Sequence, residues 1–226
     1  MSTADAATFD QQYFQVVEPG GLAERMLLKA RGEIYKDFIA MCRPDQTTTI
    51  LDVGVSDVVK DASNFLEQAY PHPGQITAAG IGTGQGVAEA YGLGGFVQIE
   101  PNARMPFEDK AFDIAVSNAV IEHTGSRENQ ARFFEELSRV AKQVFLTAPN
   151  RYFPVEHHTA IPIFHFWRPT FELACKGLRK DEWLDPANLI LTGIDDLRKL
   201  SPTARLGYTG LKLGPFSSNL FLHAVD

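Results

Sequence analysis

The sequence predicts an α/β fold: a doubly wound, mostly parallel sheet with helices on both faces. Short apolar runs rich in β-branched residues alternate along the chain with segments whose apolar residues recur at helical spacing. Residues 112–150 show this most clearly, as a strand, a helix and a second strand, a unit that makes its two strands parallel. Near the C-terminus, two strand-like runs flank Gly214-Pro215 without a helix between them, which predicts an antiparallel pair.

The remaining elements follow from the same patterns, taken in chain order. A polar arm over residues 1–18 precedes an amphipathic helix over 20–43, which Pro44 ends. We expect strands at 47–53, 75–81, 96–99, 112–116 and 143–147 and two more within 204–225, helices at 61–70, within 82–91, at 126–141 and at 169–178, and a strand followed by a helix within 190–200. The whole chain, 1–226, is expected to form one domain, in which residues 151–188, rich in aromatic residues and prolines, form a cap-like insertion.

The composition is that of an ordinary globular protein, and 226 residues suit a single domain. The formal net charge of -7 argues against a nucleic acid or an anionic membrane surface bound through bulk charge. No apolar run approaches the ~20 residues of a transmembrane helix, and the N-terminal residues do not have the pattern of a signal peptide. Cys42 and Cys175 lie far apart and lack metal-ligand spacing, so we expect reduced thiols in a cytoplasmic protein.

Three local motifs carry a resemblance to a known family. They are ILDVGVS at Ile50–Ser56, MPFEDKAFDIAVSNAVIEH at Met105–His123 and FLTAPNR at Phe145–Arg151. In this order, and with the terminal hairpin, the chain resembles the class I S-adenosylmethionine-dependent methyltransferases. The resemblance implies a Rossmann-like, seven-stranded sheet with an antiparallel C-terminal strand. It also implies methyl transfer from S-adenosylmethionine to an acceptor that the sequence does not identify, either a small molecule or a lipid-linked one.

The resemblance also implies a set of cofactor-binding residues. Gly54 permits a close backbone approach beside Asp52 at the methionine end, and Glu100 and Asn102 lie on the adenosine side. The implied cofactor-binding residues are Asp52, Gly54, Ser56, Gly82, Glu100, Asn102, Asn118 and Glu122. The chain departs from the family pattern in three places. Its first loop keeps one glycine, and its second strand ends in Ile81-Gly82 without the usual carboxylate. Where the third strand usually ends in an Asp, this chain has Pro101, with Glu100 and Asn102 on either side.

Three histidines are candidates for a catalytic role. Methyl transfer from a sulfonium is an in-line displacement that requires alignment and exclusion of water, and an oxygen or nitrogen acceptor can also require a general base. His123 follows the fourth strand, and His157 and His158 follow the fifth. We expect no metal, because the adjacent residues of Glu156-His157-His158 diverge and no third ligand lies at a diagnostic spacing. The apolar run at 161–167 either packs against the domain or faces an apolar acceptor or a lipid.

Two other functions stay open on the sequence. The departures in the cofactor motifs fit a methyltransferase-fold protein that has lost catalysis and serves as a binding module. Alternatively, Gly82-Thr83-Gly84-Gln85-Gly86 follows a strand and opens a helix, and Glu100 lies 18 residues after Gly82, which resembles a nucleotide-binding glycine loop with its ribose acid. The sequence leaves the acceptor and the oligomeric state undetermined, with a homodimer among the alternatives.

Overall fold

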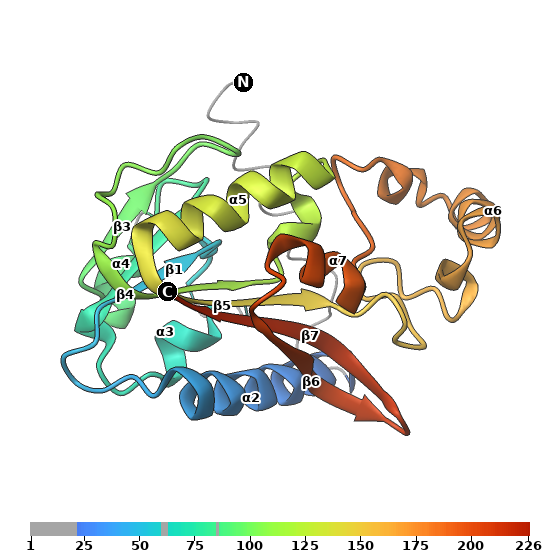
Figure 1. The fold of residues 1–226 in the computed structure, drawn as a ribbon. Helices are drawn as coiled ribbons and strands as arrows, with labels where there is room; N and C mark the ends of the chain where they lie inside the picture. Colours follow the sequence, from blue (N-terminus) through green and yellow to red (C-terminus); the bar gives the residue numbers. More distant parts are fainter. Residues whose placement is uncertain (1–21, 60–62, 85) are drawn as a thin grey trace.

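The computed structural model describes residues 22–59, 63–84 and 86–226, and its centre is one seven-stranded sheet (Figure 1). The strands are β1 (Ile50–Val53), β2 (Ile76–Gly80), β3 (Gly95–Gln98), β4 (Phe112–Asn118), β5 (Ala141–Pro149), β6 (Arg205–Leu213) and β7 (Phe216–Val225). Their order across the sheet is β3-β2-β1-β4-β5-β7-β6. The predicted fold class, Rossmann-like with an antiparallel C-terminal strand, is confirmed.

The pairing of the strands fixes where a ligand can bind. β1 pairs in parallel with both β2 and β4, whereas β7 runs antiparallel to β5 and to β6. The chain therefore builds outward from β1 to β3 in one direction, then returns to add β4 on the other side of β1. In open α/β sheets the loops diverge at such a switch point, and the space between them is where ligands bind.

Six helices complete the described fold: α2 (Leu22–Cys42), α3 (Phe65–Ala69), α4 (Val87–Tyr91), α5 (Arg127–Val140), α6 (Arg168–Leu178) and α7 (Ile194–Leu200). Figure 1 shows α5 and α7 over one face of the sheet and α2 and α3 over the other. Two apolar clusters result. One joins Leu137 of α5 and Leu197 of α7 to the sheet, and the other joins Ile34 and Phe38 of α2 to Ile50 and Phe145.

The elements deviate from the sequence-based expectation in a few places. The helix predicted at 61–70 is limited to α3, Phe65–Ala69, with Asn64 as its N-cap residue, and residues 60–62 lie outside the described residues. The strand expected within 190–200 is reduced to a single parallel bridge between Asn150 and Thr192. The predicted N-terminal arm, 1–18, also lies outside the described residues. The helix predicted at 20–43 corresponds to α2, Leu22–Cys42.

Residues 151–188, which we call the cap, contain α6 and lie beyond the end of β5 (Figure 1). The cap has a small apolar cluster of its own, made by Ile161, Phe171 and Cys175 together with Leu189. Cys42 and Cys175 are both free and buried. Among the described residues, no helix combines the length and the apolar character needed to cross a membrane. The single-domain organisation with a cap-like insertion stays a prediction.

Phe38 is expected to be a main anchor of α2 on the sheet. Its side chain is 1% exposed and meets the ring of Phe145 edge-on at 5.6 Å between centroids. Replacement by alanine leaves a cavity, so Phe38→Ala should lower the free energy of unfolding by about 3–5 kcal/mol, as measured by urea denaturation. Leu28→Ala on the same helix is the control, because Leu28 is 49% exposed and its loss should change stability by less than about 0.5 kcal/mol. Equal losses in the two variants would contradict this packing.

Candidate functional site

A cavity of about 590 Å³ opens at the carboxyl ends of β1, β2 and β4. This volume lies within the range of about 300–1,000 Å³ that is usual for small-molecule sites. Its lining includes Gly54, Glu100, Asn102 and Asn118, four of the residues that the sequence indicated for the cofactor. Gly54 follows β1, Glu100 and Asn102 follow β3, and Asn118 is the last residue of β4, so the topology of the sheet brings them together.

Gly54 is fixed in the first turn by a close approach to the turn after β4. Its φ is +107°, and a Cβ atom at this position would lie 2.2 Å from Cγ2 of Val120. An L side chain would therefore be both strained and obstructed. Gly54 and Val55 donate their amides to the carbonyl of Ala79, at 2.8 and 3.2 Å. The turn can thus approach a ligand closely, but the protein itself binds these two amides.

Two other cofactor candidates, Ser56 of the first turn and Asp52 of β1, are absent from the cavity lining. Ser56 is buried, and its amide donates to Oδ1 of Asn64 at 2.9 Å. Asp52 is also buried and lies against Glu67 of α3. Burial, together with the other carboxyl group, raises the pKa of Asp52 well above its ordinary value, and burial likewise raises the pKa of Glu67. From these two directions we expect the pair to hold one proton at neutral pH.

The described residues of the glycine loop, 82–84 and 86, are also absent from the lining of the cavity. The amides of Thr83 and Gly84 donate to the carboxylate of Asp57 at 2.8 and 2.9 Å. A Cβ on Gly82 would lie 2.2 Å from Oδ2 of Asp57, so this carboxylate packs directly on the glycine. Amides that already bind a carboxylate are not available to a phosphate, which weakens the alternative of a nucleotide-binding loop.

Asn118 and Met105 form another part of the cavity wall. Oδ1 of Asn118 accepts a hydrogen bond from Oγ1 of Thr147 at 2.7 Å, which fixes the amide at the end of β4. The backbone amide of Met105 donates to Oε2 of Glu136 at 2.9 Å. Two neighbouring elements, β5 and α5, therefore hold the lining residues in place.

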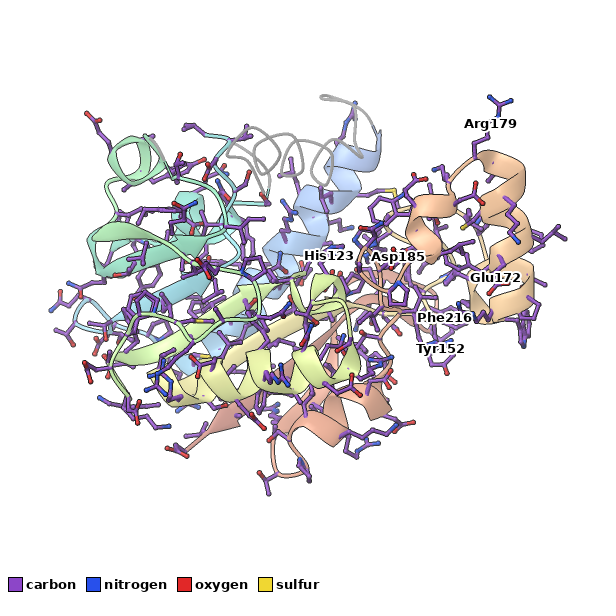
Figure 2. All side chains as sticks on the ribbon, turned by 90° about the horizontal axis from the view of Figure 1, so that it is seen from above. His123, Tyr152, Glu172, Arg179, Asp185 and Phe216 are labelled. Atoms are coloured by element: carbon purple, nitrogen blue, oxygen red, sulfur yellow. The ribbon has the colours of Figure 1, made fainter. Side chains whose placement is uncertain are left out.

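The 3₁₀ turn η2 (Ile121–His123) carries two candidates with different surroundings. Glu122 is 1% exposed, and burial raises the pKa of its carboxyl group to about 7. Neither of its oxygens accepts a hydrogen bond within the described part of the chain. His123 lines the cavity, with Nδ1 2.6 Å from the carbonyl oxygen of Asn188, and burial lowers the pKa of its ring to about 3. Figure 2 shows His123 where the cap meets the sheet.

His158 reaches the cavity from the cap. Its ring lies 4.9 Å from that of His123, centroid to centroid, at an angle of 88°. Its Nδ1 contacts Oε1 of Glu156 at 3.0 Å. Burial opposes the charge of Glu156, but hydrogen bonds from His158 and Thr159 outweigh it and lower the pKa of Glu156 to about 2. Burial also opposes the charge of His158, but Glu156 raises the pKa of His158 overall.

His157 points to a different place. It packs against Phe153 at 5.6 Å between ring centroids and lines a separate cavity of about 10 Å³ together with His165. Burial lowers the pKa of His157 to about 4. The structure therefore brings two of the three candidate catalytic histidines, His123 and His158, to the main cavity and places His157 elsewhere.

Several lining residues had no sequence signal. Arg31 of α2, Arg132 of α5 and Thr124 line the cavity, as does Ser63. The amphipathic pattern of residues 20–43 predicts a helix that covers the sheet, but it does not distinguish a polar residue at a cavity from one at the surface. Only the crossing of α2 under the sheet determines that Arg31 lies at the site.

Comparison with known proteins agrees with the fold. Residues 88–144 match the family model described as a methyltransferase domain. A SAM-dependent methyltransferase from Aquifex aeolicus is similar in structure, with a TM-score of 0.55 and 16% identity over 100% of both chains. Another, from Methanosarcina mazei, has a TM-score of 0.53 and 15% identity over 83% of this chain and 96% of that one. No curated protein sequence matches the chain.

Magnesium protoporphyrin IX methyltransferase from Synechocystis PCC 6803, whose structure has SAH bound, is similar at a TM-score of 0.59. It is 15% identical over 96% of this chain and 94% of its own. The chain thus has the class I methyltransferase fold. With the domain match at 88–144, the predicted resemblance to the S-adenosylmethionine-dependent methyltransferases is confirmed.

The carboxyl pair of Asp52 and Glu67 makes a prediction about stability. Because its folded-state pKa lies above the unfolded value of about 4, its contribution is complete below about pH 4 and is lost as the pH rises through the folded-state pKa. Asp52→Asn replaces one acid with an amide that can donate to Glu67. This variant should raise Tm at pH 8 by about 2–4 °C, the shift that about 1 kcal/mol produces in a chain of this size.

Thermal melts at pH 8 and pH 5 test this, and the gain should shrink at pH 5. Glu108→Gln, a substitution at an exposed acid, serves as the control and should change Tm little at either pH. A gain of equal size at both pH values, or a loss at pH 8, would show that the two carboxyl groups do not share a proton.

Proposed function

We propose that the protein transfers a methyl group from S-adenosylmethionine to a small-molecule or lipid-linked acceptor, and that the 590 Å³ cavity holds the cofactor. The observation that carries this proposal is the convergence of Gly54, Glu100 and Asn118 on one cavity at the switch point between β1 and β4. S-adenosylmethionine is the cofactor that the domain match and the fold support.

The residues that line the cavity can accommodate the cofactor, provided that its methionine carboxylate binds a group other than the amides of the first turn. Glu100 and Asn102 offer polar groups for the adenosyl part, and Gly54 lets the backbone approach it. The amides of Gly54 and Val55 already bind Ala79, so the carboxylate of the methionine part needs another partner. Arg31 lines the same cavity and supplies a positive charge suited to a carboxylate.

Methyl transfer requires the protein to align the methyl group of the cofactor with the acceptor, and an oxygen or nitrogen acceptor must also lose a proton. A cavity bounded by the sheet, α5 and the cap restricts the cofactor and excludes part of the water. His123 and His158 lie at its cap end, where an acceptor would meet the cofactor, and they are the two candidates to accept a proton from it. His157 contributes indirectly in this proposal, through its packing in the cap.

The cap supports an apolar or lipid-linked acceptor. It exposes several large apolar side chains, among them Trp167 at 64%, with Tyr152, Ile163 and Phe164. On soluble proteins, large apolar side chains that are exposed together often mark a binding site. A cytoplasmic location and a homodimer are parts of the proposal that the sequence suggested.

The competing function is a methyltransferase-fold module without catalysis. The internally bound amides of the first turn favour it, because they remove a usual contact for the cofactor. Calorimetric titration with S-adenosylmethionine and with S-adenosylhomocysteine separates the two functions. We expect binding of both; dissociation constants above about 1 mM for both would refute the enzyme.

Glu100→Gln should then weaken the binding of both compounds by about 10- to 100-fold, the cost of losing a charge-assisted hydrogen bond. Glu108→Gln is the matched control, since Glu108 is an exposed acid of the segment between β3 and β4 that does not line the cavity. If the two variants bound the cofactor equally well, the adenosyl part could not lie beside Glu100.

A further inference from the structure

Glu122, His123 and His158 form a cluster whose potential ligand atoms all lie within 4.8 Å of one another. Glu122 and His123 belong to the turn after β4, whereas His158 belongs to the cap. The cap therefore completes a group of three that no segment of the sequence contains on its own. Two imidazoles and one carboxylate are a common ligand set for transition metals.

Glu122 lacks the hydrogen bonds that a buried carboxylate normally has. Both of its oxygens are buried, and neither accepts a hydrogen bond from any residue that the structure describes. A buried polar group without a partner is costly, whereas most buried carboxylates are paired, hydrogen-bonded or bound to a metal. Oε1 of Glu122 lies 4.0 Å from Nε2 of His123, so its carboxylate is directed at the cluster.

The hydrogen bonds of the two histidines direct their other nitrogen atoms toward the same place. A carbonyl oxygen can only accept, so Nδ1 of His123 must donate to Asn188, and Nε2 then carries the lone pair. Nδ1 of His158 donates in the same way to the carboxylate of Glu156. A histidine that binds a metal through one nitrogen usually donates the other to a carbonyl or a carboxylate, as both do here.

Glu156 is itself held firmly in this supporting position. Its Oε2 accepts hydrogen bonds from the amides of His158 and Thr159 and from the hydroxyl of Thr159. The expectation that no metal binds was based on Glu156, His157 and His158 as ligands. In the structure, Glu156 orients His158 instead, and His157 lies apart from the cluster.

We propose that Glu122, His123 and His158 bind one divalent transition-metal ion, with zinc as the first candidate, in the wall of the main cavity. Zinc bonds to nitrogen and oxygen ligands are about 2.0–2.2 Å long, so small rotations of the three side chains would bring their ligand atoms onto one ion. Three protein ligands leave a coordination position open. Because His123 and His158 line the main cavity, that position faces it.

The open position gives the ion a role that rests on the proposed function. An acceptor hydroxyl bound there would lose its proton more easily, because the ion stabilises the resulting oxygen anion. The proton passes to water in the cavity. The oxygen then forms its bond to the methyl carbon as the carbon–sulfur bond breaks, and its electron pair stays on sulfur to give a neutral thioether. The metal site therefore favours acceptors that carry a hydroxyl group.

The test begins with metal binding alone. The full chain, stripped with a chelator and dialysed, is titrated calorimetrically with zinc chloride, and its metal content is measured after gel filtration. We expect about one zinc ion per chain and a dissociation constant of about 1 μM or lower. Cobalt chloride is the second probe, since its visible absorption reports coordination by nitrogen and oxygen. Less than about 0.1 ion per chain after gel filtration would overturn the proposal.

Variants show whether the ion lies at this cluster. Glu122→Gln and His158→Asn should each weaken zinc binding by at least about 100-fold, and Glu156→Gln by about 10- to 100-fold, because it removes only the support of a ligand. His157→Asn is the matched control: it replaces the neighbouring histidine outside the cluster and should leave zinc binding unchanged. Binding that is equal in the wild type and in Glu122→Gln would place the ion elsewhere and refute the site.

Two further measurements separate this inference from the proposed function. Circular dichroism tests whether each variant is folded. If His157→Asn is not, His72→Asn takes its place as the control, because His72 lies between α3 and β2 and belongs neither to the cluster nor to the cavity lining. Calorimetry with S-adenosylmethionine on Glu156→Gln should give an unchanged dissociation constant, because Glu156 does not line the main cavity. Zinc bound without S-adenosylmethionine would overturn the methyl transfer only, whereas S-adenosylmethionine bound without zinc would overturn the metal site only.

Discussion

The contact between Gly54 and Val120 sets the geometry of the whole site. There is no room for a Cβ at Gly54, since it would lie 2.2 Å from Cγ2 of Val120. The turns that leave β1 and β4 are therefore in close contact, and residues of both turns line the cavity. The same contact fixes the start of η2 and thus the positions of Glu122 and His123. The absence of a Cβ at Gly54 thus allows the turn after β4 to carry Glu122 and His123 close to the first turn.

The protein keeps its buried carboxyl groups in three different electrostatic states. Asp52 and Glu67 lie against each other, and burial raises the pKa of both. Glu156 has several donors around it and stays ionised, with its pKa lowered to about 2. Glu122 has no donor among the described residues. Both oxygens of Glu67 also lack a hydrogen-bond donor among the described residues, but Glu122 lies beside the imidazole rings of His123 and His158, so its surroundings call for a further ligand.

Local patterns in the sequence were enough to predict the sheet, because period-two and helical apolar spacing are local properties. They also predicted one edge of the cavity, since the carboxyl ends of parallel strands must meet at the same edge. Other features depend on long-range packing that no local pattern records. Asp52 lies against Glu67 because of where α3 crosses the sheet, and His158 meets His123 because of the path of the cap.

The departures from the glycine-rich family pattern have a structural counterpart. With one glycine in the first turn, the amides that follow bind Ala79 and Asn64, and the turn offers few backbone donors to an anion. In the proposed site, recognition of a carboxylate therefore comes from a side chain, and Arg31 of α2 lines the cavity wall. A backbone site depends on the turn alone, whereas a side-chain site also depends on how α2 packs. The packing of Phe38 and Ile34 against the sheet, at a distance from the cavity, therefore contributes to the position of the charge that the cofactor would meet.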